Sequence, residues 1–210
     1  MCDRILSILD SKDKIPSVTR IGRAGQELYY NFWTDDTHRK GIWRRTTLES
    51  FKSAKPDWEE VLDIDALAEA EGVSWVWHGY DLLDEGPAGA WDICLLSLSP
   101  GGSDAEVVRE FNLKTKKFIT PEEGGFYVPE AKCSVGYRTR DEVLVGTDFG
   151  EGSMTASGYP RTCKAWRRGT PLSEAVTVYD DAIHADISAG QVPIFGIDTT
   201  PHPILILTLP

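Results

Sequence analysis

The chain has 210 residues, of which 41% are hydrophobic and 26% charged, a composition typical of a globular protein with a packed core. Its 33 acidic residues outnumber the 22 basic ones and give a formal net charge of −11. This charge argues against a nucleic-acid-binding surface, because affinity for phosphates depends on lysine and arginine.

The N-terminus carries charge too early for a signal peptide, and no apolar run, not even residues 203–210, is long enough to span a bilayer. The cysteines are scattered without a Cys-x-x-Cys pair, which predicts small, reduced core residues rather than a zinc site. They are Cys2, Cys94, Cys133 and Cys163. We therefore expect a cytoplasmic protein that holds no metal and no cofactor.

The first third of the chain predicts a helical lead-in segment followed by short strands. A crude apolar stripe predicts a helix over residues 1–14, and Pro16 ends it. Strand patterns separated by polar or glycine-containing turns follow, at residues 18–21, 28–33, 42–47 and 61–64. Residues 65–71 then predict a short helix that ends at Gly72.

Residues 91–113 predict a β-hairpin. The run 93–96 is apolar on both faces of a strand, which places it inside a stack of sheets. The second strand alternates, with Glu106 and Glu110 on one face and apolar residues on the other. Between the strands, residues 99–104 supply the proline, glycines and short polar side chains that turns need.

The rest of the chain continues the strand pattern. The expected strands are at residues 74–80, 133–137, 142–147, 161–168 and 176–179. A long glycine- and serine-rich loop occupies residues 150–158. About a dozen short strands and almost no helix predict an all-β chain.

A repeat underlies these strands. The run WRRTTL at residues 43–48 recurs as WRRGTPL at residues 166–172. The strands at 61–65, 108–113 and 176–180 are interpreted as the closing strands of successive units, and the loop 150–158 as an insertion in the last unit. Four-stranded units of about 40 to 50 residues are typical of β-propeller blades. The fold class is therefore an incomplete β-propeller of about three blades after a short N-terminal helix, with a β-sandwich as the structural alternative.

Several stretches, in order along the chain, carry a resemblance to a known family. They are ILDSKDKIP (8–16), YYNFW (29–33), GIWRRTTLESF (41–51), SLSPGGSDA (97–105), EVVREFNLKTKKF (106–118), GGFYVPEAK (124–132), VLVGTDFG (143–150), SGYPR (157–161) and WRRGTPLSEAV (166–176). Together they resemble the N-terminal β-propeller of the prolyl oligopeptidase family of serine peptidases, covering about a third of a full family member.

The resemblance implies a seven-bladed propeller that caps an α/β-hydrolase domain carrying a Ser-Asp-His triad. It implies hydrolysis of short peptides after proline, with the propeller admitting oligopeptides and excluding folded proteins. The implied partners are the hydrolase domain and oligopeptide substrates, with no nucleic acid and no membrane. The implied division of the chain is a helical lead-in at 1–14, a partial propeller at 15–190, and a tail at 191–210 that no longer follows the family pattern.

No catalytic residue can be assigned by this resemblance. The chain has no Gly-x-Ser-x-Gly nucleophile motif, since the nearest run, Gly150 to Met154, has the wrong spacing. It also lacks the third glycine of a dinucleotide loop. We therefore expect the chain alone to be inactive, and the alternative function is a non-catalytic propeller that acts as a protein-interaction module.

Three groups of side chains have residue types that could carry chemistry. The cluster Asp35, Asp36 and His38 has the composition of an acid–base or metal site, but a solvated loop between strands is the favoured interpretation. Asp63 and Asp65 are expected to cap a helix rather than to act as paired carboxylates.

The third group is Ser153 or Ser157 with the distant His184, which forms a triad only if the fold brings them together. In the Trp-Arg-Arg runs, the tryptophans are expected to lie between sheets and the arginines to meet acidic residues on neighbouring strands.

Overall fold

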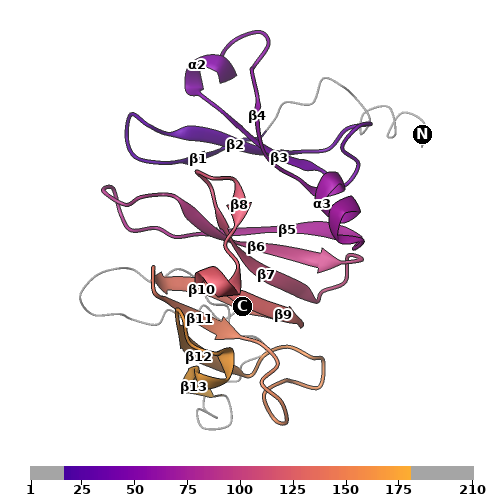
Figure 1. Ribbon diagram of the computed structural model, residues 1–210, viewed down its shortest axis with the longest axis vertical. Coiled ribbons are helices and arrows are strands. Elements are labelled where there is room, and N and C mark those ends of the chain that lie inside the picture. Colours follow the sequence, from indigo (N-terminus) through magenta and orange to yellow (C-terminus); the bar gives the residue numbers. More distant parts are fainter. Residues whose placement is uncertain (1–16, 181–210) are drawn as a thin grey trace. The chain divides into compact units, whose positions relative to one another are not determined.

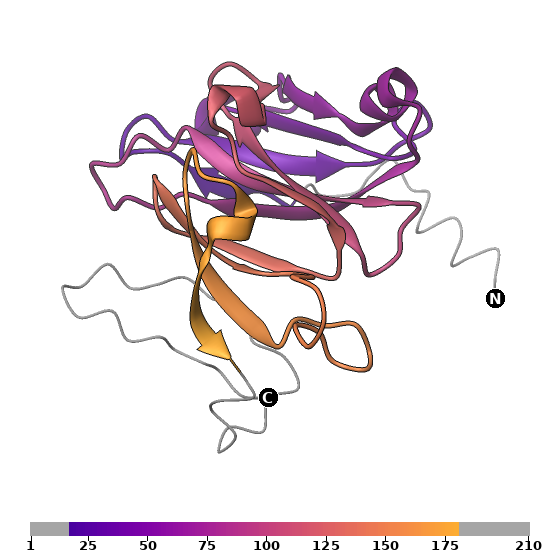
Figure 2. The ribbon, with the colours of Figure 1, turned by 60° about the horizontal axis from the view of Figure 1, so that its bottom comes forward.

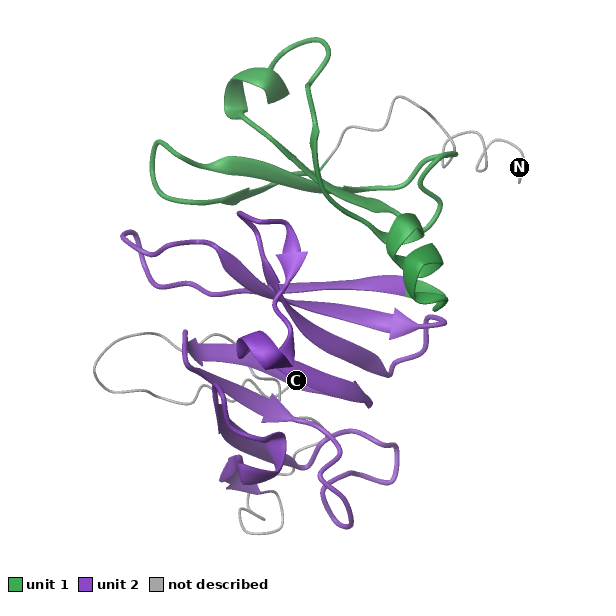
Figure 3. Cartoon of the chain, in the orientation of Figure 1, with its two compact units in different colours: residues 1–75 green, residues 76–210 purple. Residues whose placement is uncertain are grey.

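The computed structural model describes residues 17–180 of the chain (Figure 1). The expected helix at 1–14 and the tail at 191–210 lie outside these residues. The described chain forms three antiparallel sheets, each built from consecutive strands, and divides into two compact units at residue 75 (Figure 3). Sheets of consecutive strands match propeller blades rather than the two interleaved sheets of a sandwich.

The first unit contains one sheet of four strands in the order β1-β2-β3-β4. The strands are β1 (Thr19–Ile21), β2 (Leu28–Trp33), β3 (Ile42–Thr46) and β4 (Glu59–Asp63). A one-turn helix, α2 (Leu48–Phe51), lies in the connection from β3 to β4, and α3 (Ile64–Glu71) follows β4.

The expected short helix is confirmed as α3, and its ends follow the usual capping chemistry. The side chain of Asp63 accepts hydrogen bonds from the backbone N–H groups of Asp65 and Ala66, so that it caps the N-terminus. Gly72 ends the helix in the left-handed conformation, with φ of 66°.

The second sheet has the order β5-β6-β7-β8, with β9 also paired to β7. Its strands are β5 (Trp75–Leu82), β6 (Ile93–Pro100), β7 (Glu106–Asn112), β8 (Lys117–Phe118) and β9 (Tyr127–Ala131). The hairpin expected at 91–113 is β6 and β7, so it forms the middle of the sheet. It does not supply the closing strand of its unit, as the spacing of the repeat had suggested, because β8 and β9 lie outside β7.

The outer strand of this sheet is interrupted by a loop, the excursion 119–125. β8 pairs with one half of β7 and β9 with the other half. On each side of the excursion the ladder is held by Glu110, whose carbonyl accepts from Ile119 N and whose N–H donates to Phe126 O. The excursion contains a 3₁₀ turn, η1 (Pro121–Glu123). β8 and β9 therefore form one outer strand that is interrupted by the excursion.

The third sheet has the order β10-β11-β12-β13. Its strands are β10 (Ser134–Thr139), β11 (Glu142–Gly146), β12 (Thr162–Arg167) and β13 (Val176–Asp180), with a 3₁₀ turn η2 (Leu172–Glu174) before β13. The long loop expected around 150–158 lies between β11 and β12, which confirms it as an insertion between the second and third strands of the sheet.

The second and third sheets pack face to face within the second unit (Figures 1 and 2). Their shared core consists of buried apolar side chains from both sheets: Leu95, Val108, Phe126, Val128, Val143, Val145 and Trp166. Burial of apolar side chains in a close-packed core is the main favourable contribution to the stability of such a unit.

The Trp-Arg-Arg repeat lies on the third strand of the first and third sheets, but not in the same register. A bulge interrupts the pairing with the fourth strand after Trp43 in β3, and after Cys163 in β12. Trp43 is the last residue before the bulge in β3, whereas in β12 that position is Cys163 and Trp166 comes three residues later. Because side chains alternate along a strand, an odd offset places the two tryptophans on opposite faces of equivalent strands.

Candidate functional site

A buried carboxylate holds the second and third sheets together. The side chain of Glu110, on β7, has 0% exposure. Both carboxylate oxygens receive a 2.7 Å hydrogen bond from the guanidinium of Arg168. Tyr137 O–H donates to Oε1 at 2.6 Å and Phe126 N donates to Oε2 at 3.2 Å. Each oxygen thus has two donors, which is what a buried charge needs to be tolerated.

Arg168 ties this carboxylate to the surrounding loops. Its Nη1 also donates to the carbonyl oxygen of Gly124 in the excursion, at 2.9 Å, and its Nε donates to the carbonyl oxygen of Arg140, at 3.0 Å. The guanidinium lies 4.5 Å from the centre of the Phe126 ring. The hydrogen bonds to Glu110 raise the pKa of Arg168, and burial together with the Glu110 charge raises the pKa of Tyr137.

A second arginine extends this network along the same interface. Arg140, in the turn between β10 and β11, donates to Glu85 at 2.7 Å and to Asp92 at 2.7 Å. These contacts, with Glu85 the larger contributor, raise the pKa of Arg140. The Trp-Arg-Arg expectation is thus confirmed for Trp166 and Arg168, which lie between two sheets and meet an acidic residue.

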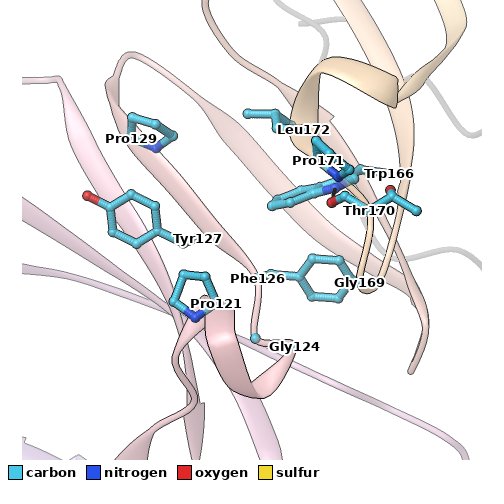
Figure 4. A pocket seen from close by; sticks show the side chains of 11 residues that line it. Pro121, Gly124, Phe126, Tyr127, Pro129, Trp166, Gly169, Thr170, Pro171 and Leu172 are labelled. Atoms are coloured by element: carbon cyan, nitrogen blue, oxygen red, sulfur yellow. Dashed lines mark hydrogen bonds between the residues drawn. The ribbon is translucent and has the colours of Figure 1, made fainter.

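An open apolar pocket of about 400 Å³ lies beside this network (Figure 4). Hereafter it is called the rim pocket. One side comes from the excursion and β9: Pro121, Gly124, Gly125, Phe126, Tyr127 and Pro129. The other side comes from the end of β12 and the turn into β13: Trp166, Gly169, Thr170, Pro171 and Leu172.

The polar groups of the rim pocket are largely engaged within the protein. Trp166 Nε1 donates to Thr170 O at 2.8 Å, and Thr170 Oγ1 donates to Arg167 O at 2.8 Å. Gly125 N donates to Thr120 O at 2.8 Å, and Phe126 N is used by Glu110. The lining contains no carboxylate, ammonium, guanidinium or imidazole group. The pocket therefore offers apolar and aromatic surface with few free donors.

The residues weighed as a metal or acid–base cluster form a loop stabilised by local hydrogen bonds. Asp35 Oδ1 accepts from the backbone N–H groups of Thr37 and His38, and these bonds lower the pKa of Asp35, with the His38 N–H the larger cause. His38 Nδ1 lies 3.1 Å from Asp35, and His38 Nε2 lies 3.8 Å from Asp63. Among residues 17–180, no group of three histidine, cysteine or acidic side chains could hold a metal ion.

The other candidates are also engaged in local structure. Asp63 caps α3, and Asp65 Oδ2 accepts from Lys40 N at 2.9 Å. Ser153 is buried and its Oγ donates to Gly150 O at 2.6 Å, whereas Ser157 is exposed and pairs with Thr155. His184 lies outside the described residues, so its relation to these serines stays untested.

The arginines of the first repeat differ from each other in their surroundings. Arg45 pairs with Glu59 on the neighbouring β4, as expected, at 2.6 Å. Arg44 instead contacts two rings, 4.6 Å from the centre of Trp33 and 4.4 Å from the centre of Trp58. These cation–π contacts and a 2.9 Å hydrogen bond from its Nε to Asn31 Oδ1 hold its guanidinium in place.

Sequence reasoning missed the Glu110–Arg168 pair and the rim pocket. Glu110 lies on the polar face of an alternating strand, and such a face is expected to be exposed to solvent. Its partner, Arg168, is 58 residues away in the sequence. One signal was available in the sequence, the expectation that the arginines of the repeat meet acidic residues. That expectation did not identify Glu110 as the acidic residue. The pocket depends on the excursion, which no periodic pattern marks.

Comparison with known proteins agrees with this geometry. A family model described as the prolyl oligopeptidase N-terminal β-propeller domain matches residues 10–190. An uncharacterised peptidase of Sinorhizobium fredii is 40% identical over 195 residues, covering 92% of this chain and 25% of its own length. An uncharacterised peptidase of Rickettsia prowazekii is 29% identical over 160 residues, covering 72% of this chain and 21% of its own.

Solved structures show the same likeness. A post-proline cleaving enzyme from Rickettsia typhi superposes with a TM-score of 0.71 at 27% identity, over 85% of this chain and 25% of that chain. Oligopeptidase B from Leishmania major, at 12% identity and a TM-score of 0.57 over 85% of this chain and 23% of that chain, shares the fold. The chain thus spans about a quarter of the length of these relatives, less than the third expected from the resemblance.

Proposed function

Since the chain belongs to the prolyl oligopeptidase family, through its N-terminal β-propeller domain, we propose that it forms the first blades of a serine endopeptidase that hydrolyses short peptides after proline. The observation that carries this proposal is the succession of three antiparallel sheets, two of four strands and one of five, over the residues that the family model matches. The Rickettsia typhi likeness supports the post-proline specificity, because that protein is described as a post-proline cleaving enzyme.

In this proposal the propeller controls access and an α/β-hydrolase domain performs the chemistry. Residues 15–190 are the blade-forming part, residues 1–14 lead into it, and residues 191–210 are a divergent tail. Buried charge pairs between blades, such as Glu110 with Arg168, keep neighbouring sheets in fixed contact, so that an oligopeptide passes and a folded protein does not. The scattered cysteines support a cytoplasmic site of action. No helix within residues 17–180 is long and apolar enough to cross a membrane.

The first test is whether the chain has activity by itself. We expect no turnover of a chromogenic prolyl peptide and no labelling by a serine-reactive phosphonate, because no nucleophile motif is present in the sequence. The Rickettsia typhi enzyme serves as the positive control. Turnover or labelling by the purified chain would contradict the expected division of roles. Its loss in Ser153→Ala or Ser157→Ala would assign the activity to that serine rather than to a contaminating peptidase.

The second test is whether the blades gate access in a complete enzyme. The matching segment of the Rickettsia typhi enzyme is replaced by residues 10–190 of this chain. We expect the hybrid to cleave a short prolyl peptide and to leave a folded, proline-containing protein intact. A second hybrid with Arg168→Met loosens the contact between blades and should cleave the folded protein faster. Equal rates on folded and short substrates in the first hybrid would rule out the gating role.

A further inference from the structure

Arg44, on β3, has no acidic partner among the described residues. Its Nε donates to Asn31 Oδ1, and its guanidinium contacts the rings of Trp33 and Trp58. Within the described chain its Nη1 and Nη2 make no hydrogen bond or ion pair, and neither atom is enclosed, so both are open to solvent. Burial lowers the pKa of Arg44, although the charge of Asp35 acts in the opposite direction. One edge of a half-buried guanidinium is therefore free.

A shortage of carboxylates does not explain this free edge. The chain has 33 acidic residues against 22 basic ones. Glu60 is paired with Arg44 in the β3–β4 ladder, yet their side chains form no ion pair. Burial removes part of the hydration of a guanidinium, and an ion pair is the usual compensation. Other arginines have that compensation: Arg20, Arg45, Arg138, Arg140 and Arg168.

The repeat identifies the face of the first sheet on which Arg44 lies. Arg44 and Lys164 are the first residues after the bulge in β3 and β12, so they occupy equivalent positions. Trp166 comes two residues after Lys164 and shares its face, because side chains alternate along a strand. In the third sheet this face meets the preceding sheet, whose Glu110 is bound by Arg168. The face of Arg44 thus corresponds to the one by which the third sheet meets its predecessor.

We propose that Arg44 binds a side-chain carboxylate on the sheet that precedes the first blade, as Arg168 binds Glu110. A propeller repeats its blades around an axis, so the first blade also has a predecessor, which lies outside the described residues. The Nη1 and Nη2 edge can donate two parallel hydrogen bonds to one carboxylate. The rings of Trp33 and Trp58 offer apolar contact, so the partner is an aspartate or glutamate set among apolar side chains. The inference rests on the proposed function, in which the chain forms the first blades of a larger enzyme.

The first test asks whether the free edge binds a carboxylate. The probe is phenylacetate, which carries one carboxylate on an apolar group, and the full chain is labelled with 5-fluorotryptophan. We expect the fluorine NMR signals of Trp33 and Trp58, assigned with Trp33→Phe and Trp58→Phe, to shift with a dissociation constant on the order of 10 mM. Phenylacetamide, the neutral isostere, should bind at least about ten-fold more weakly. No shift with phenylacetate, or equal binding of phenylacetamide, overturns the proposal.

Matched variants locate the binding. Arg44→Met keeps an apolar stem against the two rings but removes the donors, and it should weaken phenylacetate binding at least about ten-fold. Arg45→Met removes the neighbouring arginine of the same repeat, which is already paired with Glu59, and should stay within about two-fold. Circular dichroism checks that both variants are folded. Unchanged binding in Arg44→Met places the carboxylate elsewhere and also overturns the proposal. The comparison of phenylacetate with phenylacetamide needs no variant.

The second test asks where the carboxylate comes from. The matching segment of the Sinorhizobium fredii peptidase is replaced by residues 10–190 of this chain. In this hybrid phenylacetate should no longer shift the signals of Trp33 and Trp58, because a carboxylate of the preceding sheet occupies Arg44. Arg44→Met should also lower the midpoint of thermal unfolding of the hybrid more than Arg45→Met does.

A site that stays open in the hybrid would be a site for a free carboxylate ligand, and that outcome overturns the proposed partner. Hydrolysis of a prolyl peptide by the hybrid is measured separately. A hybrid in which Arg44 is occupied but no peptide is cleaved contradicts the proposed function alone.

Discussion

At the scale of single residues, the described chain depends on the few polar groups that it buries. Glu110 is enclosed completely and has four donors, whereas the carboxylates of the other pairs, such as Glu59 and Glu142, are partly exposed. Burying a carboxylate costs free energy. This cost is offset only when hydrogen-bond donors reach both carboxylate oxygens, as they do at Glu110. The pair therefore specifies how the two sheets meet more than it adds to the stability.

The first prediction concerns this pair. Arg168→Met alone should lower the free energy of unfolding by about 3 kcal/mol or more, because it leaves the Glu110 charge buried without its partner. Glu110→Leu alone should cost less, because Arg168 is 22% exposed and keeps Asp141 at 3.5 Å. The double variant should lose clearly less than the sum of the two. Urea unfolding of the four proteins gives the coupling free energy. Arg138→Met, in the exposed pair with Glu142, is the control and should cost about 0.5 kcal/mol or less. Additive losses in the double variant would show that the buried pair is not coupled.

The second prediction concerns the cysteines. Burial raises the pKa of Cys163 from 9.0 to about 11, and also raises the pKa values of Cys94 and Cys133. Between about pH 9 and 11 the unfolded chain gives up thiol protons that the folded chain keeps. The thiol contribution to the free energy of unfolding should therefore be constant below pH 8 and fall above pH 9. Urea unfolding at several pH values measures this fall, which should be shallower in Cys163→Ala. A free energy of unfolding that rises across this window would contradict the burial of these thiols.

At the scale of elements, the structure separates what local sequence determines from what it does not. The hairpin of β6 and β7 and the helix α3 were predicted because their turn and capping residues lie within a few positions of one another. The excursion was not predicted, since it is fixed by Glu110, a residue on another strand. The register of the Trp-Arg-Arg repeat was also not predictable, because it depends on where a bulge falls between β12 and β13.

The excursion gives the third prediction. A Cβ on Gly125 would lie 2.1 Å from the carbonyl oxygen of Ile119, which is backbone and cannot move aside cheaply. Gly125→Ala should therefore lower the free energy of unfolding by about 2 kcal/mol or more. Gly101→Ala is the control, since its Cβ meets no atom within 4 Å and its φ of +85° alone costs about 1 kcal/mol. Equal losses at the two positions, measured by urea unfolding, would mean that the close approach does not matter.

At the scale of the whole molecule, the chain has strands at the ends of its sheets. β13 is the last strand of the third sheet, and its Val176 and Val178 are 67% and 42% exposed. Apolar edge strands of this kind template pairing with another chain. The propeller class was predictable from the sequence because each sheet uses consecutive strands, whereas the contacts between sheets were not, since they join residues far apart in the sequence.

The fourth prediction is that the isolated chain self-associates through this edge. Analytical ultracentrifugation should show a concentration-dependent increase in mass, and Val178→Lys should reduce it by placing a charge on the strand. Val76→Lys, at an exposed valine on a different strand, is the matched control and should have little effect. A monomer at all concentrations would mean that the edge is protected in solution.

The interrupted outer strand of the second sheet makes its length adjustable. Pairing with β7 stops at Phe118 and resumes after Phe126. On both sides of this gap the backbone is hydrogen-bonded to the same residue, Glu110. The tip of the loop, Pro121–Glu123, lies outside the ladder, whereas its base is fixed by the close approach of Gly125 to Ile119. The tip of the excursion is thus a place in the second sheet where the length of the loop can change, and the excursion lines the rim pocket.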